Sequence, residues 1–92
     1  MTEVASGSIV LSKKGRDAGR YFIVVRREGE FCYLADGKIR RVKSPKKKKL
    51  KHVEPTGQVH EGIGKKFLAG ATVFDSEVFS ALKSLNLEKE EV

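Results

Sequence analysis

Residues 8–35 read SIVLSKKGRDAGRYFIVVRREGEFCYLA, which is three short runs of strand-forming residues joined by two glycine-containing connections. The runs occupy 8–12, 20–26 and 31–35. They are rich in β-branched and aromatic side chains, which pack well on a pleated surface and favour strands over helices. Gly15 and Gly19 bracket the first connection and permit backbone angles that a Cβ would oppose. The stretch therefore predicts three consecutive short strands with tight, exposed connections.

Two further strands are predicted in the same half of the chain. Asp36-Gly37 is typical of a two-residue hairpin, because both central residues of a type I′ turn need positive φ angles. It leads into a predicted strand over 38–42, and a fifth strand over 50–53 ends before Pro55. Short antiparallel strands remove their exposed edges by closing on themselves. A mainly β fold is expected, in which residues 1–55 form a small SH3-like antiparallel barrel of about five strands.

Residues 56–92 are predicted to form a short helical extension. Apolar residues recur every four positions over 58–69, which is helical spacing. A second helix is predicted from Ser76 to Leu85, where Asp75 can act as the N-cap. Phe74 and Phe79 occupy the two positions of a hydrophobic staple around that cap.

Positive charge is concentrated in the first 53 of the 92 residues. This part holds 15 of the 19 Lys and Arg residues against five acids, a formal charge of +10, whereas the remainder carries −3. A small β module with such an excess attracts polyanions at long range, and nucleic acid is the commonest one in a cell. The charge distribution therefore favours a protein that binds nucleic acid.

The composition argues against several other classes of protein. The one cysteine, Cys32, allows no internal disulfide or zinc cluster and is expected to be a small buried hydrophobe. His52 and His60 have no neighbouring cysteine or paired carboxylate, so neither catalysis nor a metal or other cofactor is expected. No apolar run approaches the ~20 residues of a membrane span, and no secretory pattern opens the chain. A cytoplasmic protein is expected, with no small-molecule substrate and no membrane partner.

Three clusters of basic residues are the candidate contacts with nucleic acid. The first surrounds the glycine connection, where exposed backbone N–H groups add donors to the side chains. The second lies on and after the predicted strand 38–42. The third is a lysine run that is expected to be an exposed arm or loop, because four adjacent lysines cannot all share one face of a strand. Lysine contacts phosphate without demanding geometry, so backbone binding with little base readout is expected. The candidate residues are Lys13, Lys14, Gly15, Arg16, Gly19 and Arg20, then Lys38, Arg40, Arg41 and Lys43, and finally Lys46, Lys47, Lys48, Lys49, Lys51 and His52.

Four aromatic residues accompany these clusters: Tyr21, Phe22, Phe31 and Tyr33. Most are expected in the core of so small a barrel. Tyr21 and Tyr33 are the better candidates for stacking on a base.

Two separated segments resemble a known family. Residues 10–25, VLSKKGRDAGRYFIVV, are similar to a KOW motif, the strand–loop–strand element of ribosomal and transcription-associated RNA-binding proteins. Residues 45–55, PKKKKLKHVEP, follow in the right order for the KOW-containing large-subunit ribosomal proteins of archaea and eukaryotes and their small bacterial relatives. The short stretch from Asp36 to Lys46 and the different tail favour the bacterial relatives.

The resemblance, which covers residues 7–55, implies an SH3-like barrel that binds ribosomal or other structured RNA through its loops. It carries the RNA-binding role to Lys13, Lys14, Gly15, Arg16, Gly19 and Arg20, and to Lys46, Lys47, Lys48, Lys49, Lys51 and His52.

The sequence thus predicts a ribosome-associated or ribosomal-protein-like RNA-binding protein that holds structured RNA mainly by its phosphates. A protein-interaction module of SH3-like type is one alternative, because an open sheet edge can add a strand from an acidic partner. Double-stranded DNA is another, because phosphate contacts alone do not distinguish it from RNA. The acidic tail is also a candidate to dock on the basic face and regulate it.

Overall fold

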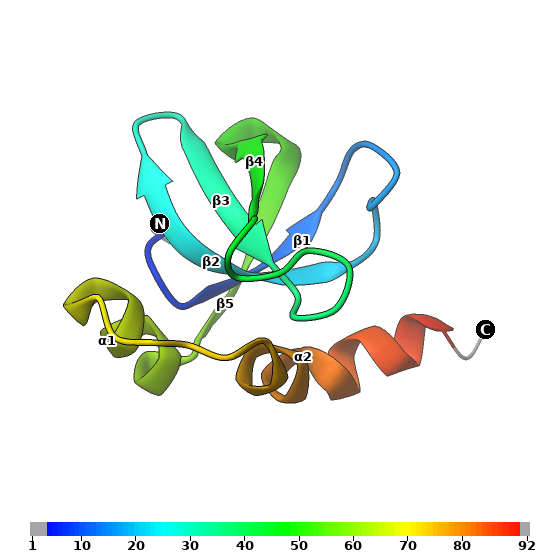
Figure 1. Cartoon of the computed structure of the whole chain (residues 1–92). Coiled ribbons are helices and arrows are strands. Elements are labelled where there is room, and N and C mark those ends of the chain that lie inside the picture. Colours follow the sequence, from blue (N-terminus) through cyan, green and yellow to red (C-terminus); the bar gives the residue numbers. More distant parts are fainter. Residues whose placement is uncertain (1–3, 91–92) are drawn as a thin grey trace.

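A computed structural model describes the backbone of residues 4–90 and the side chains of residues 4–86. Five antiparallel strands form one open sheet in the order β4-β3-β2-β1-β5, and two helices lie along one side of it (Figure 1). The strands are β1 (Ser8–Ser12), β2 (Tyr21–Glu28), β3 (Phe31–Ala35), β4 (Lys46–Lys49) and β5 (Val53–Val59), and the 3₁₀ turn η1 (Leu50–His52) precedes β5. The helices are α1 (Glu61–Ala69) and α2 (Asp75–Glu90). The predicted mainly β fold with a helical tail is confirmed.

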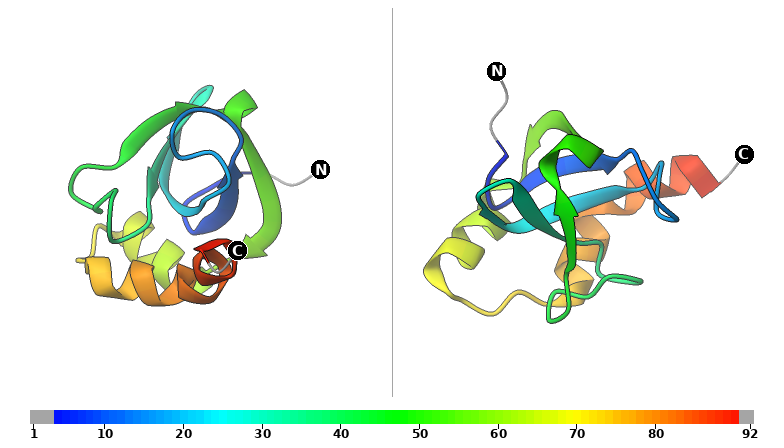
Figure 2. Two further views of the ribbon diagram at one scale, coloured as in Figure 1. Left: turned by 90° about the vertical axis from the view of Figure 1, so that its right-hand side faces the viewer. Right: turned by 90° about the horizontal axis from the view of Figure 1, so that it is seen from above.

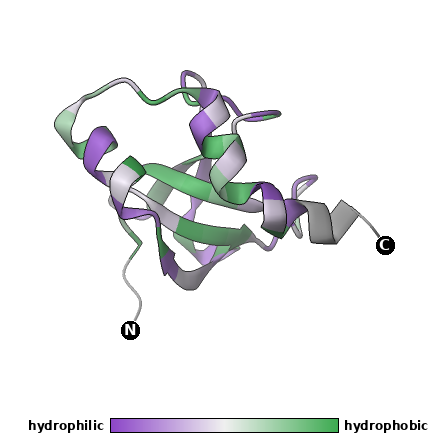
Figure 3. Ribbon diagram, turned by 90° about the horizontal axis from the view of Figure 1, so that it is seen from below, coloured by the Kyte–Doolittle hydropathy of each residue, from purple (hydrophilic) through white to green (hydrophobic). Residues whose placement is uncertain are grey.

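The central strands β1, β2 and β3 bury side chains on both faces of the curved sheet, which explains why they contain nearly continuous apolar runs. Figure 2 shows the strands curling over one side while the helices cover the other. The enclosed core contains Val4, Val10, Phe22, Val24, Cys32, Leu34 and Val53. The second core lies between sheet and helices and contains Ile9, Ile23, Ala35, Ile63, Val73, Val78 and Leu82. Because successive strand residues point to opposite faces, each of β1, β2 and β3 contributes to both cores. From the helix side, the covered strands carry mostly hydrophobic segments (Figure 3).

Cys32 is fully buried in the enclosed core, as predicted. Burial raises the pKa of its thiol to about 11. The thiol is therefore protonated at neutral pH and is an unreactive part of the packing.

Helix α1 crosses the chain just before β1 at a contact between two glycines. A Cβ on Gly64 would lie 2.7 Å from the carbonyl oxygen of Ser6, and one on Gly7 would lie 2.8 Å from the Cα of Gly64. The backbone N–H of His60 donates to the carbonyl of Gly7 at 2.8 Å, which ties the start of the helix to the same place. The His60 side chain then caps the helix by accepting from the N–H of Ile63 at 3.1 Å.

Replacing Gly64 with Ala is expected to lower the free energy of unfolding by about 2 kcal/mol, because the added methyl has no room against backbone. This is the opposite of the effect of helix propensity, which favours Ala by roughly 1 kcal/mol. Gly62→Ala is the matched control in the same helix, since its Cβ would meet only the His60 side chain at 3.5 Å. That variant is expected to stabilise the protein by about 0.5 kcal/mol. Urea unfolding measures both, and equal effects of the two substitutions would contradict the close approach.

Helix α2 is tied to the sheet at two points. The side-chain amide of buried Asn86 accepts from the N–H of Tyr21 at 2.9 Å and donates to its carbonyl at 3.2 Å, as a neighbouring strand would. At the start of the helix, the Asp75 carboxylate accepts from the N–H of Val42 at 2.7 Å. Gly37, with φ +80°, passes so close that a Cβ would lie 2.2 Å from the carbonyl oxygen of Asp75. Helix α2 therefore holds the loop between β3 and β4 in place.

The prediction of a strand over 38–42 is wrong. The Asp36 carboxylate accepts hydrogen bonds from the N–H groups of Lys38 at 2.9 Å and Arg40 at 2.8 Å. These bonds bend the chain into a wider loop than the two-residue hairpin that Asp36-Gly37 predicts.

Two other predictions are also corrected. The lysine run, predicted as an exposed arm or loop, is the edge strand β4, which pairs with β3 from Phe31↔Lys49 to Leu34↔Lys46. The predicted strand 50–53 consists of η1 and the first residue of β5. Pro55 lies inside β5 instead of ending it, which an edge strand tolerates because proline removes a hydrogen-bond donor.

Both predicted helices exist, with different bounds. Residues 58–59 continue β5, so that α1 begins at Glu61, and α2 extends beyond the predicted 76–85 at both ends. The predicted N-cap residue Asp75 is the first residue of α2, and its carboxylate bonds Val42 instead of capping. Both residues of the predicted hydrophobic staple, Phe74 and Phe79, are exposed. The predicted boundary between residues 55 and 56 falls inside β5, and the terminal residues 1–3 and 91–92 lie outside the described part of the chain.

Candidate nucleic-acid interface

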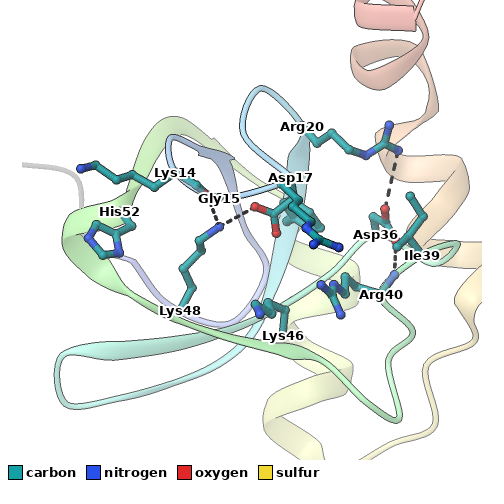
Figure 4. Close-up of a pocket in the computed structure, with 12 residues that line it drawn as sticks. Lys14, Gly15, Asp17, Arg20, Asp36, Ile39, Arg40, Lys46, Lys48 and His52 are labelled. Atoms are coloured by element: carbon teal, nitrogen blue, oxygen red, sulfur yellow. Dashed lines mark hydrogen bonds and ion pairs between the residues drawn. The ribbon is translucent and has the colours of Figure 1, made fainter.

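A cavity of about 580 Å³ opens at one end of the curved sheet (Figure 4). Three segments meet there: the connection between β1 and β2, the loop between β3 and β4, and β4 with η1. Within the described residues, no side chain of α1 or α2 lines it. The lining residues are Lys14, Gly15, Arg16, Asp17, Arg20, Phe22, Asp36, Ile39, Arg40, Lys46, Lys48 and His52. Six of these are Lys or Arg and two are Asp, so the cavity is positively charged.

One lysine of the cavity holds the β1–β2 connection in shape. The ammonium of Lys48 donates to the Asp17 carboxylate at 2.5 Å, the Ser12 hydroxyl at 2.7 Å and the carbonyl of Lys14 at 2.6 Å. The Ser12 hydroxyl in turn donates to the same Asp17 oxygen at 2.9 Å. The side chains of Lys48 and Asp17 are only 9% and 14% exposed. Lys48 thus acts within the protein, although the sequence predicts it as an RNA contact.

The same contacts set the ionisation of Asp17. Burial raises the pKa of its carboxyl group, but hydrogen bonds from Lys48 and Ser12 lower it by more. The net result is a pKa below the usual value of 3.8, so the carboxylate stays ionised at neutral pH.

The second carboxylate of the cavity, Asp36, is also engaged within the protein. It is buried, and besides its two backbone hydrogen bonds it lies 3.6 Å from the guanidinium of Arg20. Both acids of the cavity therefore neutralise a cation of the protein itself. They organise the two loops and leave the remaining cations uncompensated.

Four cations of the cavity remain for an anionic partner: Lys14, Arg16, Arg40 and Lys46. Within the described residues, none of them forms an ion pair with a carboxylate. They come from three separate segments that line the same cavity. In Figure 4, Arg40 and Lys46 lie beside each other, whereas the side chain of Lys14 extends away from them. Separate segments that line one cavity can contact several phosphates of a folded polyanion at once.

Strand β4 divides the predicted lysine run between two faces. Lys46 and Lys48 share the inner face with their partners Leu34 and Cys32, and both line the cavity. Lys47 and Lys49 point to the outer face and are exposed. The run is therefore not one uniform patch, and adjacent lysines in it have different surroundings.

The outer face carries two contacts between a cation and an aromatic ring. The guanidinium of Arg26 lies 3.8 Å from the centre of the Tyr33 ring, and the ammonium of Lys47 lies 4.4 Å from that of Phe31. Both rings are half-buried, and both are already covered by a cation on this face. Phe22 is buried, and it is the one of these four aromatic residues that lines the cavity.

The other predicted contacts lie outside the cavity. Lys49 and Lys51 border a smaller hollow with Arg27 and Glu30. The remaining residues are Lys13 and Gly19 in the β1–β2 connection and Lys38, Arg41 and Lys43 in the β3–β4 loop. All of these lysines and Arg41 are exposed, so they extend the basic surface without joining the converging group.

His52 is half-buried at the edge of the cavity. Burial lowers the pKa of its imidazole, and the nearby positive charges of Lys51 and Lys14 lower it further. It is therefore neutral at pH 7 and can donate or accept a hydrogen bond.

Sequence reasoning missed four lining residues: Asp17, Phe22, Ile39 and Asp36. The acids carry the wrong charge for a phosphate contact, and the two apolar residues look like core or loop. The sequence offered one weak signal, because Ile39 is an apolar residue between Lys38 and Arg40.

The chain matches no protein-family model and no curated protein. Over the described residues, neither helix combines the length and apolar character needed to cross a membrane. The same residues contain no group of three or more His, Cys, Asp or Glu side chains that could hold a metal ion.

Proposed function

We propose that this protein binds structured RNA, as a cytoplasmic, ribosome-associated module of the SH3-like KOW type that catalyses no reaction. The observation that carries the proposal is the convergence of Lys14, Arg16, Arg40 and Lys46 around one cavity whose acids are already paired. A duplex has one negative charge per about 1.7 Å of its axis, so a converging cationic group of this kind engages several phosphates.

The fold is consistent with a barrel of that type. Five short antiparallel strands curl around one small core, and β1 pairs with both β2 and β5. The connection between β1 and β2, which carries the KOW-like residues, forms one wall of the cavity. Two independent features of the chain, the motif resemblance and the charge, thus favour the same surface.

The salt dependence of binding tests the proposal. If about six to eight phosphates are engaged, log K is expected to fall against log salt with a slope of roughly −4 to −7. The measurement is fluorescence anisotropy of a labelled RNA hairpin at several potassium chloride concentrations. A slope near zero would contradict binding through phosphates.

Two adjacent lysines of β4 provide a matched pair of variants. Lys46→Ala removes a cation from the cavity and is expected to weaken binding of every RNA sequence alike and to reduce the salt slope by about one. Lys47→Ala removes the same charge from the outer face and is expected to have a much smaller effect. Equal losses in both variants would show that net charge, and not the cavity, attracts the RNA.

The alternative of strand addition by a protein partner finds little support. Both edges of the sheet carry features that discourage pairing, namely four lysines in β4 and Pro55 with Gly57 in β5. Docking of the acidic tail on the basic face also finds little support. The helices of the tail pack on one face of the sheet, and the enclosed core lies on the other.

A further inference from the structure

The cavity has a shape that phosphate binding alone does not require. Surface lysines on a flat patch suffice to hold a duplex backbone. Here the cations surround a concavity of about 580 Å³, which lies within the roughly 300–1,000 Å³ typical of pockets for small organic molecules. A duplex is too wide to enter a space of that size, whereas a single nucleotide is small enough.

The interior of the cavity is partly apolar. Two apolar residues line it: Phe22, which is 1% exposed, and Ile39, which is 64% exposed. An exposed apolar side chain beside several cations makes no favourable contact with a phosphate. It does make one with the face of a nucleobase, which is flat and poorly hydrated.

Polar atoms in the walls suit the edge of a base. One carboxylate oxygen of Asp17 and the Nε of Arg40 are buried and have no hydrogen-bond partner among the described residues. A buried polar atom without a hydrogen-bond partner destabilises the structure. The Watson–Crick edge of every nucleobase carries both a donor and an acceptor, so a base in the cavity can offer a partner to each of these two atoms.

We infer that the cavity binds one unstacked nucleotide of a structured RNA, with its base between Phe22 and Ile39 and its flanking phosphates on Lys14, Arg16 and Lys46. This inference rests on the proposed function and narrows its target. The protein should prefer RNA with a bulged or flipped-out nucleotide over a continuous helix. The cost of unstacking is smallest where the nucleotide is already unpaired, which gives selectivity without reading a long sequence.

The test compares two labelled RNA hairpins that differ only by one unpaired nucleotide in the stem, with the full-length protein at a fixed salt concentration. The wild type is expected to bind the bulged hairpin about tenfold more tightly, because packing one base on an apolar surface raises the affinity by about that factor. Ile39→Ser changes no charge and is expected to remove most of this preference. Leu68→Ser is the matched control, because Leu68 is 78% exposed on α1 and does not line the cavity.

The possible results separate this inference from the proposed function. Loss of the preference in Ile39→Ser and its retention in Leu68→Ser would support the nucleotide site. If the wild type binds both hairpins equally and with a steep salt slope, the site is refuted and the proposed function stands. A preference that survives Ile39→Ser also refutes the site. If neither hairpin binds, both conclusions fail.

Discussion

A chain that ends after His60 is expected to be unfolded, even though it retains all five strands. The reason is the second hydrophobic core, in which Ile9, Ile23 and Ala35 of the sheet are buried by residues of the tail. Removal of the tail would expose these side chains and also discard the burial of Ile63 and Leu82 with their neighbours. Each large apolar side chain contributes about 1.5–3 kcal/mol, so the loss is on the order of 10 kcal/mol and matches the whole stability of a small domain.

Circular dichroism and urea unfolding of the shortened chain measure this directly. Point variants of the full chain provide a graded version of the same test. Leu82→Ala, at a position that is 1% exposed, is expected to destabilise the protein by about 3 kcal/mol. Leu68→Ala removes the same atoms from an exposed position of α1 and is expected to change stability by less than about 0.5 kcal/mol. A shortened chain that unfolds cooperatively would show that the sheet is stable alone and that the helices are an accessory.

The second large effect is expected from Lys48→Met, which keeps the length of the side chain and removes its charge. The carboxylate of Asp17 would then be buried without its partner, and such changes cost about 3–5 kcal/mol. The ammonium also bonds Ser12 and the backbone of Lys14, so the β1–β2 connection would lose the link that holds it against β4. Lys47→Met is the control on the neighbouring residue and is expected to cost less than about 1 kcal/mol, the range of an exposed contact with an aromatic ring.

The loss of unfolding free energy in Lys48→Met is expected to depend on pH, in a direction that follows from the lowered pKa of Asp17. A carboxyl group with a lowered folded-state pKa contributes stability that is fully present above its unfolded value of 3.8 and is lost as pH falls through the folded value. The difference in unfolding free energy between wild type and Lys48→Met should therefore be constant near neutral pH and shrink below about pH 4. Urea titrations at a series of pH values check this, and a difference that stays constant to pH 3 would assign the effect to packing instead of charge.

Prediction from sequence succeeded where the signal is local. The first and third strands have the predicted bounds, and the second differs by one or two residues, because short β-branched runs between glycines favour extended backbone whatever surrounds them. It failed at the lysine run, since four identical residues carry no alternation that would identify a strand. It also failed at Asp36-Gly37, where side-chain hydrogen bonds and the close approach of α2 override a common hairpin signal.

The candidate site was likewise predicted only in part. The prediction from sequence includes all the cations that line the cavity, but it also includes several that lie elsewhere. A sequence shows which residues are charged, but it does not show where their side chains point. Lys46 and Lys47 are the plainest case, since only the pairing of β4 with β3 sends one into the cavity and the other to the opposite face.

By itself, the sequence determined that this is a small, basic, mainly β protein with a helical tail, because composition, charge and strand propensity are properties of short segments. The tertiary structure decided which cations are available. Lys48 and Asp17 are 31 positions apart in the chain, and only folding brings them together, cancels their charges and leaves the other cations around an open cavity. Pairing across such distances depends on strand register and on burial, and neither is encoded in any one segment.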